Sequence, residues 1–398
     1  MTLAPGLAVV FTSDEVRIDD SPEGRWRSMQ VRQARLLPAL RERGASPETL
    51  GRAELLGIQI NHMGGRDGTL DEGQLAQFES ELMRLEEDAL NLRLAAVAAP
   101  EGEVRAVWHR LTETTPASIE ALAQDLAGAH FNAFFPEVIY GSHAIYPDST
   151  GLYPHWPHFG GTDALAELVR ACHARGIEVH AWVHCFFIGV QGSGEEPALL
   201  AQTHPDWLER NREGDTVSRD EQRYMFFNPA HPEVRRAMID AYVAMARDYE
   251  IDGLHLDYIR YANASSWERL WGHSDFTRAR VREELGFDPM DITPADAERW
   301  AQWIAWREEQ ITSFVREVSE AVRAVRPSIR ITAAVFPGLE QAIEIKGQNW
   351  AAWAREATVD ALLPMAYFAD AADVRAAVEE MAQQLPPGSP RVVGLAPF

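Results

Sequence analysis

From Glu103 onward the sequence alternates between short apolar segments and longer segments with helical periodicity, and this alternation constrains the fold more than any other feature. The apolar segments have the length and the β-branched and aromatic content of buried strands. Strands that alternate with helices form a parallel sheet with right-handed crossovers. We predict strands at 104–109, 131–138, 177–184, 251–261, 329–336, 359–367 and 391–396, and helices at 118–130, 163–175, 232–249, 294–325, 350–356 and 372–384.

Seven strands are one short of a closed eight-stranded parallel barrel. We predict the fold class α/β, with a (β/α)₈ TIM-type barrel over residues 101–398 and a small α/β segment over residues 1–100. In that segment we expect strands at 7–12 and 55–61, helices at 25–43 and 72–92, and a structural role. Either this segment fills the gap in the barrel, or the barrel is incomplete at its C-terminus.

Charge and hydropathy exclude several classes of partner. A net charge of −23 argues against nucleic acid, because no basic patch stands out to neutralise phosphates. No apolar run is long enough to span a bilayer. The first residues lack a basic region and a long apolar core, so we expect no signal peptide, although this leaves the localisation open. Cys172 and Cys185 do not form a metal-type pair, and we expect both thiols to be free and buried.

The segment Ile251–Tyr261 predicts the centre of a functional site. With a period of two, Leu254 and Leu256 share one face with Tyr258, while Gly253, His255 and Asp257 share the other. Buried polar groups are costly unless they are satisfied, and in a parallel barrel the carboxyl ends of the strands open toward the substrate. We therefore predict a catalytic role for Asp257. The alternative is a structural carboxylate held by Arg260 or another base.

Several motifs occur in order at the ends of the predicted strands. They are Phe135-Pro-Glu-Val138 with Tyr146-Pro147, Val179-His-Ala-Trp182, Asn228-Pro-Ala-His-Pro-Glu-Val234, Asp252-Gly-Leu-His-Leu-Asp-Tyr-Ile-Arg-Tyr261, Ala334-Val-Phe-Pro337 and Leu363-Pro-Met-Ala-Tyr367. In these motifs the chain resembles the family-10 glycosyl-hydrolase-like proteins over residues 103–398. The resemblance implies a bacterial (β/α)₈ enzyme that acts on a polysaccharide. Many relatives continue after His-Ala-Trp with an Asn-Pro-Tyr-Arg-like sequence, whereas here Val183-His-Cys-Phe186 follows, which bears on substrate preference.

Glycoside hydrolysis usually needs two carboxylates, one as acid and one as base or nucleophile. Asp257 is one candidate, and Glu137 near the end of the second strand is the best second one. We expect both to converge with His184 and Tyr367 at one end of the barrel. Asp252 and Asp360 begin their strands and should be structural.

Three histidines should point into the barrel near Asp257, namely His180, His184 and His255. They could satisfy hydrogen bonds within the barrel, position substrate hydroxyls, orient Asp257, or bind a metal together with Asp257 and Glu137. The resemblance implies no metal, and we predict no metal and no other cofactor. The residues expected to bind substrate are His180, Trp182, His184, His255, Arg260, Tyr261, Tyr140, Tyr146, Asn228, Met365 and Tyr367.

Three functions remain open. The first, implied by the resemblance, is a glycoside hydrolase that cleaves a cell-wall or exopolysaccharide glycan of the amino-sugar type. The second is a metal-dependent polysaccharide deacetylase, and the third a non-catalytic carbohydrate-binding barrel. The expected partner in each case is a polysaccharide or oligosaccharide.

Overall fold

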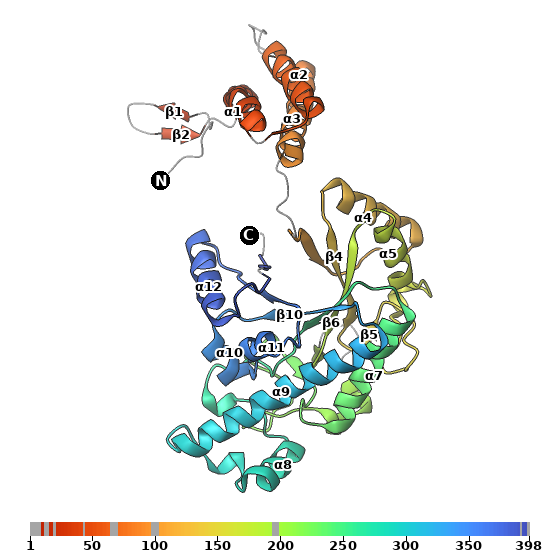
Figure 1. The fold of residues 1–398 in the computed structure, drawn as a ribbon, viewed down its shortest axis with the longest axis vertical. Coiled ribbons are helices and arrows are strands. Elements are labelled where there is room, and N and C mark those ends of the chain that lie inside the picture. Colours follow the sequence, from red (N-terminus) through yellow and green to blue (C-terminus); the bar gives the residue numbers. More distant parts are fainter. Residues whose placement is uncertain are drawn as a thin grey trace. The chain divides into compact units, whose positions relative to one another are not determined.

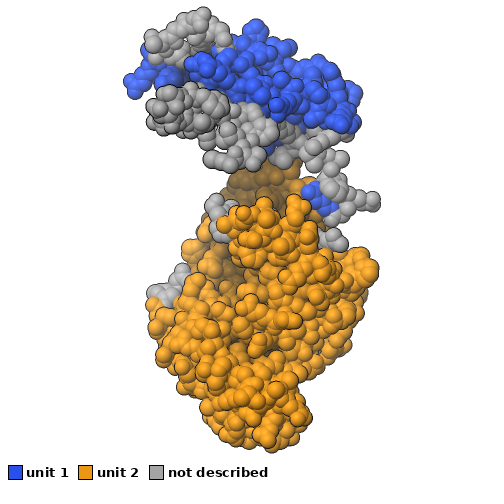
Figure 2. Space-filling view, turned by 90° about the vertical axis from the view of Figure 1, so that its left-hand side faces the viewer, with its two compact units in different colours: residues 1–103 blue, residues 104–398 orange. Residues whose placement is uncertain are grey.

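The computed structural model describes residues 9–11, 16–18, 21–42, 44–63, 71–96, 103–192, 199–390 and 392–395. The chain divides into two compact units, Met1–Glu103 and Val104–Phe398, which Figure 2 shows in different colours. Each unit has a hydrophobic core of its own.

The N-terminal unit is mainly helical. It contains a two-stranded antiparallel ribbon, β1 (Val9–Phe11) and β2 (Val16–Ile18), followed by helices α1 (Pro22–Glu42), α2 (Pro47–Met63) and α3 (Glu72–Ala96). The strand predicted at 55–61 is wrong, because these residues lie inside α2. Leu56 and Ile60 are buried one helical turn apart, whereas Leu55 is 56% exposed, so the apolar run has the period of a helix.

The second unit is built on a parallel sheet, as predicted (Figure 1). Its strand order is β11-β10-β9-β6-β4-β3, and a short strand, β5 (His143–Ala144), pairs antiparallel with β4. The sheet has the curvature and order of a half-barrel that ends at β3 and β11. The parallel strands are β3 (Ala106–His109), β4 (Ala133–Tyr140), β6 (Glu178–His184), β9 (Gly253–Asp257), β10 (Arg330–Val335) and β11 (Ala361–Pro364).

The seventh predicted strand, 391–396, does not form as a strand in its described part, 392–395. Gly394 makes one parallel bridge with Met365, and its N–H donates to the carbonyl of Pro364 at 3.0 Å. A Cβ on Gly394 would lie 2.4 Å from the Trp108 ring of β3, so this residue sits between the two ends of the sheet. Residues 391 and 396–398 lie outside the described part of the chain.

Helices cover the outer face of the sheet, at the positions predicted from their periodicity. They are α4 (Pro116–Gly128), α5 (Ala164–His173), α7 (Pro232–Asp248), α9 (Ala297–Val325), α11 (Trp350–Arg355) and α12 (Ala371–Gln384). Helix α4 begins earlier than the predicted residue 118, and its N-cap is Thr115. Ser118 is instead the third helical residue, and the two side chains form a capping box.

The connecting segments contain further short elements that the sequence did not predict. They are the antiparallel hairpin β7 (Phe187–Val190) and β8 (Tyr224–Phe226), the helices α6 (Leu199–Thr203), α8 (Asp275–Leu285) and α10 (Leu339–Lys346), and the 3₁₀ turns Pro157–Phe159, Pro205–Trp207, Trp267–Arg269 and Pro289–Asp291.

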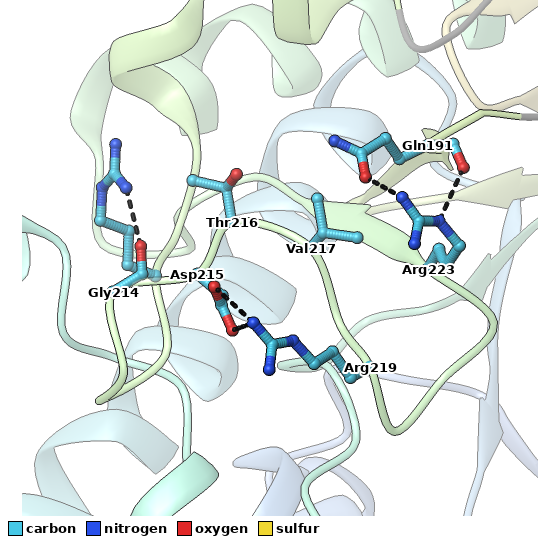
Figure 3. A pocket seen from close by; sticks show the side chains of 8 residues that line it. Gln191, Gly214, Asp215, Thr216, Val217, Arg219 and Arg223 are labelled. Carbon is cyan, nitrogen blue, oxygen red and sulfur yellow. Dashed lines mark hydrogen bonds and ion pairs between the residues drawn. The ribbon is translucent and has the colours of Figure 1, made fainter.

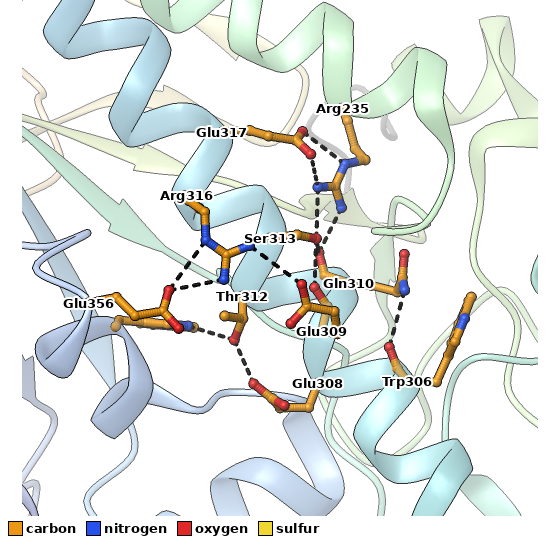
Figure 4. Close-up of polar contacts among 11 residues, drawn as sticks. Arg235, Trp306, Glu308, Glu309, Gln310, Thr312, Ser313, Arg316, Glu317 and Glu356 are labelled. Carbon is orange, nitrogen blue, oxygen red and sulfur yellow. Dashed lines mark hydrogen bonds and ion pairs between the residues drawn. The ribbon is translucent and has the colours of Figure 1, made fainter.

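The long helix α9 ties neighbouring elements together through its polar face (Figure 4). Arg235 of α7 forms an ion pair with Glu317 at 2.6 Å, and Arg316 pairs with Glu356, next to α11, at 3.0 Å. The opposite face of α9 is apolar and buried, as the helical period of its sequence requires. No helix in the described ranges combines the length and the apolar character needed to cross a bilayer. Cys172 and Cys185 are free and buried, as expected.

Two carboxylates at the amino ends of strands hold adjacent strands together. Asp252 accepts a hydrogen bond from the backbone N–H of Val179 at 2.7 Å, and Asp360 accepts one from Ile331 at the same distance. Both are therefore structural, as their positions at the strand starts predicted.

Candidate functional site

The register of the sheet brings polar side chains together at the carboxyl ends of β6 and β9. His180 lies beside Gly253, and the last pair in this ladder is His184 with Asp257. On the other side of β6, Trp182 pairs with Glu137, next to a β-bulge in β4. Because the strands are parallel, Glu137, His184 and Asp257 reach the same edge of the sheet, where barrel active sites lie.

Asp257 is held by Trp182 and by the backbone of the next residue. The Trp182 indole Nε1–H donates to Oδ2 at 3.0 Å, and the N–H of Tyr258 donates to Oδ1 at 2.6 Å. Burial raises the pKa of Asp257 above the ordinary aspartate value, while the nearby His184 acts in the opposite direction. The carboxyl group therefore takes up a proton more readily than an exposed aspartate would.

The strand ends at Asp257 because Tyr258 has a left-handed backbone, with φ of +48°. The predicted extension of this strand to Tyr261, with Tyr258 on the face of Leu254 and Leu256, is wrong. A bulky residue in this region is strained by about 1–3 kcal/mol and persists only where its surroundings fix it. The strained residue is the one whose N–H holds the Asp257 carboxylate.

Glu137 lies inside β4 and is an ion-paired, buried carboxylate. Arg110 donates to it through Nε at 2.6 Å and Nη2 at 3.2 Å, and His184 Nε2 lies 2.9 Å from its Oε1. Burial by itself would raise the pKa of Glu137, but His184 and Arg110 outweigh it and lower the pKa below its ordinary value. Glu137 is therefore ionised at neutral pH. The side chain of Arg110 is 52% exposed, whereas that of Glu137 is only 1% exposed.

His184 sits between the two carboxylates inside an aromatic enclosure. The ring centroid of Tyr258 is 4.6 Å away, and the rings of Phe187, Trp182 and Tyr140 lie 5.3–5.5 Å away. Its Nδ1 is buried without a hydrogen-bond partner in the described residues. The ring is therefore fixed by packing and by Glu137 rather than exposed as a free base.

His255 and His180 lie deeper in the barrel, below the site. The indole N–H of Trp108 donates to His255 Nε2 at 3.0 Å, so His255 must carry its proton on Nδ1, which lies 2.8 Å from the Thr332 hydroxyl. Burial drives the pKa of His255 well below its usual value. His180 stacks on Phe135 with ring centroids 4.6 Å apart. Both rings are less than 5% exposed, which places them among the interior contacts of the barrel.

Four residues expected to bind substrate are buried, and their contacts lie within the protein. Tyr261 and Tyr146 are 1% exposed and pack in the core, Tyr261 against Arg307 and Tyr146 against Tyr249. The Asn228 amide donates to Ser274 and Thr277 at 2.9 Å. Arg260 is buried and pairs with Glu221. These four residues, which belong to three different motifs, thus have contacts that hold the fold, because buried polar groups need partners.

Arg260 does not hold Asp257. Its guanidinium donates to Glu221 through Nη2 at 2.5 Å and Nη1 at 3.1 Å, and it lies 4.8 Å from the ring centroid of Tyr258. The carboxylate that pairs with Arg260 is therefore Glu221. Neither Glu221 nor Arg110 was predicted. Arg110 directly follows β3, so its place at a strand end was a signal in the sequence, whereas Glu221 lies in a connection whose course the sequence does not reveal.

Two expected residues, Tyr140 and Tyr367, do lie around the site. Tyr140 is half-buried and packs under the guanidinium of Arg110, 4.0 Å from its ring centroid. Tyr367 is 46% exposed, and burial together with the Asp257 charge raises the pKa of its phenol to about 12. Met365 is partly exposed just beyond β11. Tyr140, Tyr367 and the half-buried Trp182 give the site an aromatic rim.

A separate pocket of about 400 Å³ lies in the long connection between β6 and α7 (Figure 3). Its arginines are tethered to neighbours, Arg219 to Asp215 at 3.2 Å and Arg223 to the carbonyl of Gln191 at 3.2 Å. The residues that line the pocket do not include any of those around Asp257. Within the described ranges, no group of three or more His, Cys, Asp or Glu side chains has the arrangement of a metal site.

Comparisons with known proteins agree with the motifs. A sequence profile described as "Glycosyl hydrolase-like 10" matches residues 103–395. Glycosyl hydrolase YngK of Bacillus subtilis is 20% identical over 276 residues, which cover 62% of this chain and 48% of that protein. Glycosyl hydrolase DigH of Escherichia coli K12 is 21% identical over 208 residues, which cover 46% of this chain and 41% of that protein. The chain thus spans less than half the length of these two relatives.

The structure is similar to that of the PgaB (BpsB) glycoside hydrolase domain from Bordetella bronchiseptica. The TM-score is 0.55 at 15% identity, and the match covers 71% of this chain and 81% of that one. At this level of identity the similarity shows a shared fold.

Proposed function

Because this chain belongs to the glycosyl hydrolase-like 10 family, as its motifs predicted, we propose that it hydrolyses glycosidic bonds in a bacterial cell-wall or exopolysaccharide glycan that contains amino sugars. Asp257 would be the general acid and Glu137 the ionised partner. The observation that carries the proposal is a pair of carboxylates on β4 and β9, the two strands that flank β6, whose surroundings shift their pKa values in opposite directions. Such a separation is what distinguishes the acid from the base in carboxylate catalysis.

In this proposal Asp257 delivers its proton to the glycosidic oxygen as the bond to the anomeric carbon breaks. The raised pKa suits this step, because the acid must be protonated near the working pH. Trp182 and the N–H of Tyr258 hold the carboxyl group in place before the substrate arrives. The same two donors stabilise the carboxylate that remains after proton transfer.

Glu137 would supply negative charge to the oxocarbenium-like transition state. Arg110 covers it from the solvent side, so Glu137 can act directly as base or nucleophile only after Arg110 moves aside. The Arg110 side chain is 52% exposed and contacts both Glu137 and the Tyr140 ring. Tyr140, Trp182 and Tyr367 offer aromatic faces for sugar rings.

The test compares the wild-type chain with Asp257→Asn on chitooligosaccharides and on deacetylated peptidoglycan strands. New reducing ends should appear with the wild type and fall at least ~100-fold in the variant, because general acid catalysis is worth about 10²–10⁴ in rate. Asp275→Asn is the matched control, since the Asp275 side chain is fully exposed, and it should keep full activity. Both variants should keep the wild-type melting temperature to within a few degrees.

Each of the other outcomes points to a different function. Release of acetate without new reducing ends would indicate the deacetylase. Binding of the oligosaccharides without any cleavage would indicate a carbohydrate-binding barrel. Equal activity in wild type and Asp257→Asn would refute the assignment of Asp257.

A further inference from the structure

The barrel unit contains the single lysine of the chain, and that lysine is buried. Of the 37 basic residues all but Lys346 are arginines. Lys346 is the last residue of α10, in the connection that follows β10, and it is 5% exposed. An ammonium group loses much of its hydration when it is buried. Packing alone therefore does not explain why lysine occupies this position.

Lys346 holds the segment that follows Asp257 at two points. Its Nζ donates to Asn263 Oδ1 at 2.9 Å, and its main-chain carbonyl accepts the N–H of Tyr261 at 3.0 Å. The Nζ also lies 4.0 Å from the ring centroid of Phe336, which provides a cation–π contact. These contacts join the connection after β10 to the connection after β9.

Glu221 holds the middle of the same segment. Its carboxylate accepts the guanidinium of Arg260 and, at 2.9 Å, the N–H of Asn263. Arg260 in turn lies against the ring of Tyr258, the strained residue. The segment from Asp257 to Asn263 is thus anchored by residues from the connections after β6 and β10. A left-handed tyrosine persists only where such anchors fix its backbone.

We propose that Lys346 is a positioning residue for glycan hydrolysis. Lys346 keeps the segment from Asp257 to Asn263 in the conformation that places the Asp257 carboxyl group against Trp182. This inference rests on the function proposed above. Burial lowers the pKa of the Lys346 amine to about 7, with the neighbouring Arg260 acting in the same direction and Glu221 against it. The lysine consequently reduces stability near neutral pH, as expected of a residue retained for function.

The test is Lys346→Met, which keeps the length of the side chain and removes its charge. The variant should melt at a higher temperature than the wild type, while kcat on the glycan falls about 10- to 100-fold and KM changes little, because misplacing a catalytic group by 1 Å costs about that much. Arg299→Met is the matched control, because Arg299 is exposed on α9, and it should leave kcat unchanged. A purely structural lysine would instead lower stability and activity together when replaced, or change neither.

A second measurement does not depend on catalysis. The indole N–H resonance of Trp182, assigned by its loss in Trp182→Phe, reports the hydrogen bond to Asp257 in ¹⁵N NMR spectra. It should shift in Lys346→Met and stay in place in Arg299→Met. If the wild type cleaves no glycan, the proposed function is refuted. The Trp182 resonance still tests whether Lys346 positions the Asp257 carboxyl group. An unshifted resonance with unchanged kcat would overturn the proposal, and Lys346→Gln provides the same comparison if the methionine variant does not fold.

Discussion

Gly253→Ala is a sharp test of how the interior of the barrel is packed. A Cβ on Gly253 would lie 2.0 Å from His180 Nδ1 and within 2.8 Å of two further ring atoms. Ordinary contact needs about 3.4 Å or more, so the ring would have to move by more than an ångström. The ring cannot easily do so, because it is 4% exposed and stacked on Phe135.

We expect Gly253→Ala to destabilise the barrel unit by about 1–3 kcal/mol, the usual range for overpacking. For a unit of this size that lowers the melting temperature by about 2–4 °C per kcal/mol. Gly128→Ala serves as the control, because Gly128 lies near the end of α4 with no atom close to the new Cβ. It should be neutral or stabilising by up to about 1 kcal/mol.

A double-mutant cycle with His180→Ala isolates the contact. Once the imidazole is gone, adding the Cβ at residue 253 should cost little, so the two changes should couple by at least about 1 kcal/mol. The assay is urea unfolding of the four proteins followed by tryptophan fluorescence. Strictly additive free energies of unfolding would refute the reasoning, because the predicted cost arises entirely from the clash between Gly253 and His180.

Two other predictions concern charged groups around the site. Glu137→Gln should lower the free energy of unfolding by about 1–3 kcal/mol at pH 7, because it removes the charge that accepts the two Arg110 hydrogen bonds. Glu309→Gln, on an exposed pair, should change it by less than about 1 kcal/mol. The folded-state pKa of Glu137 is lowered, so the ionised carboxylate stabilises the fold at neutral pH, and this stabilisation is lost on acidification. Urea titrations should therefore show a smaller difference between variant and wild type at pH 4 than at pH 7. For Lys346 the folded-state pKa of about 7 lies below the ordinary value of 10.5. Between pH 7 and pH 10.5 the amine is therefore protonated in the unfolded chain but largely neutral in the folded one. The free energy of unfolding should rise with pH over this range, by about 5 kcal/mol at most. Urea unfolding across this range should show the rise in wild type and a smaller one in Lys346→Met; equal slopes would contradict the argument.

The sequence by itself determined the parallel sheet and most of its helices, because each depends on local periodicity. The alternation along Ile177–His184 and the apolar stripe of α9 are visible without any knowledge of the partner surfaces. The motifs at the strand ends also indicated the family. The same reasoning placed Asp257 and His184 correctly at the carboxyl ends of their strands.

Local periodicity gave a wrong prediction where a short apolar run is compatible with both a strand and a helix. Residues 55–61 read as a strand but are helical, because the burial of Leu56 and Ile60 against neighbouring helices decided between the two. The last predicted strand, 391–396, contributes one bridge in its described part, since pairing depends on the strand beside it and not on its own propensity.

Only the tertiary structure decided which polar residues of the motifs face the site and which stabilise the fold. Arg260, Tyr261 and Asn228 stand near Asp257 or in another motif. Their partners come from distant segments: Glu221 from a connection, Arg307 from α9 and Ser274 from the N-cap of α8. Arg110 and Lys346 gain their roles in the same way, through contacts with Glu137 and Asn263. A sequence reveals the period of its own helices and strands. The partner of a buried charge depends instead on which distant segments the fold brings together, because a buried charge needs a hydrogen-bond or ion-pair partner among its neighbours.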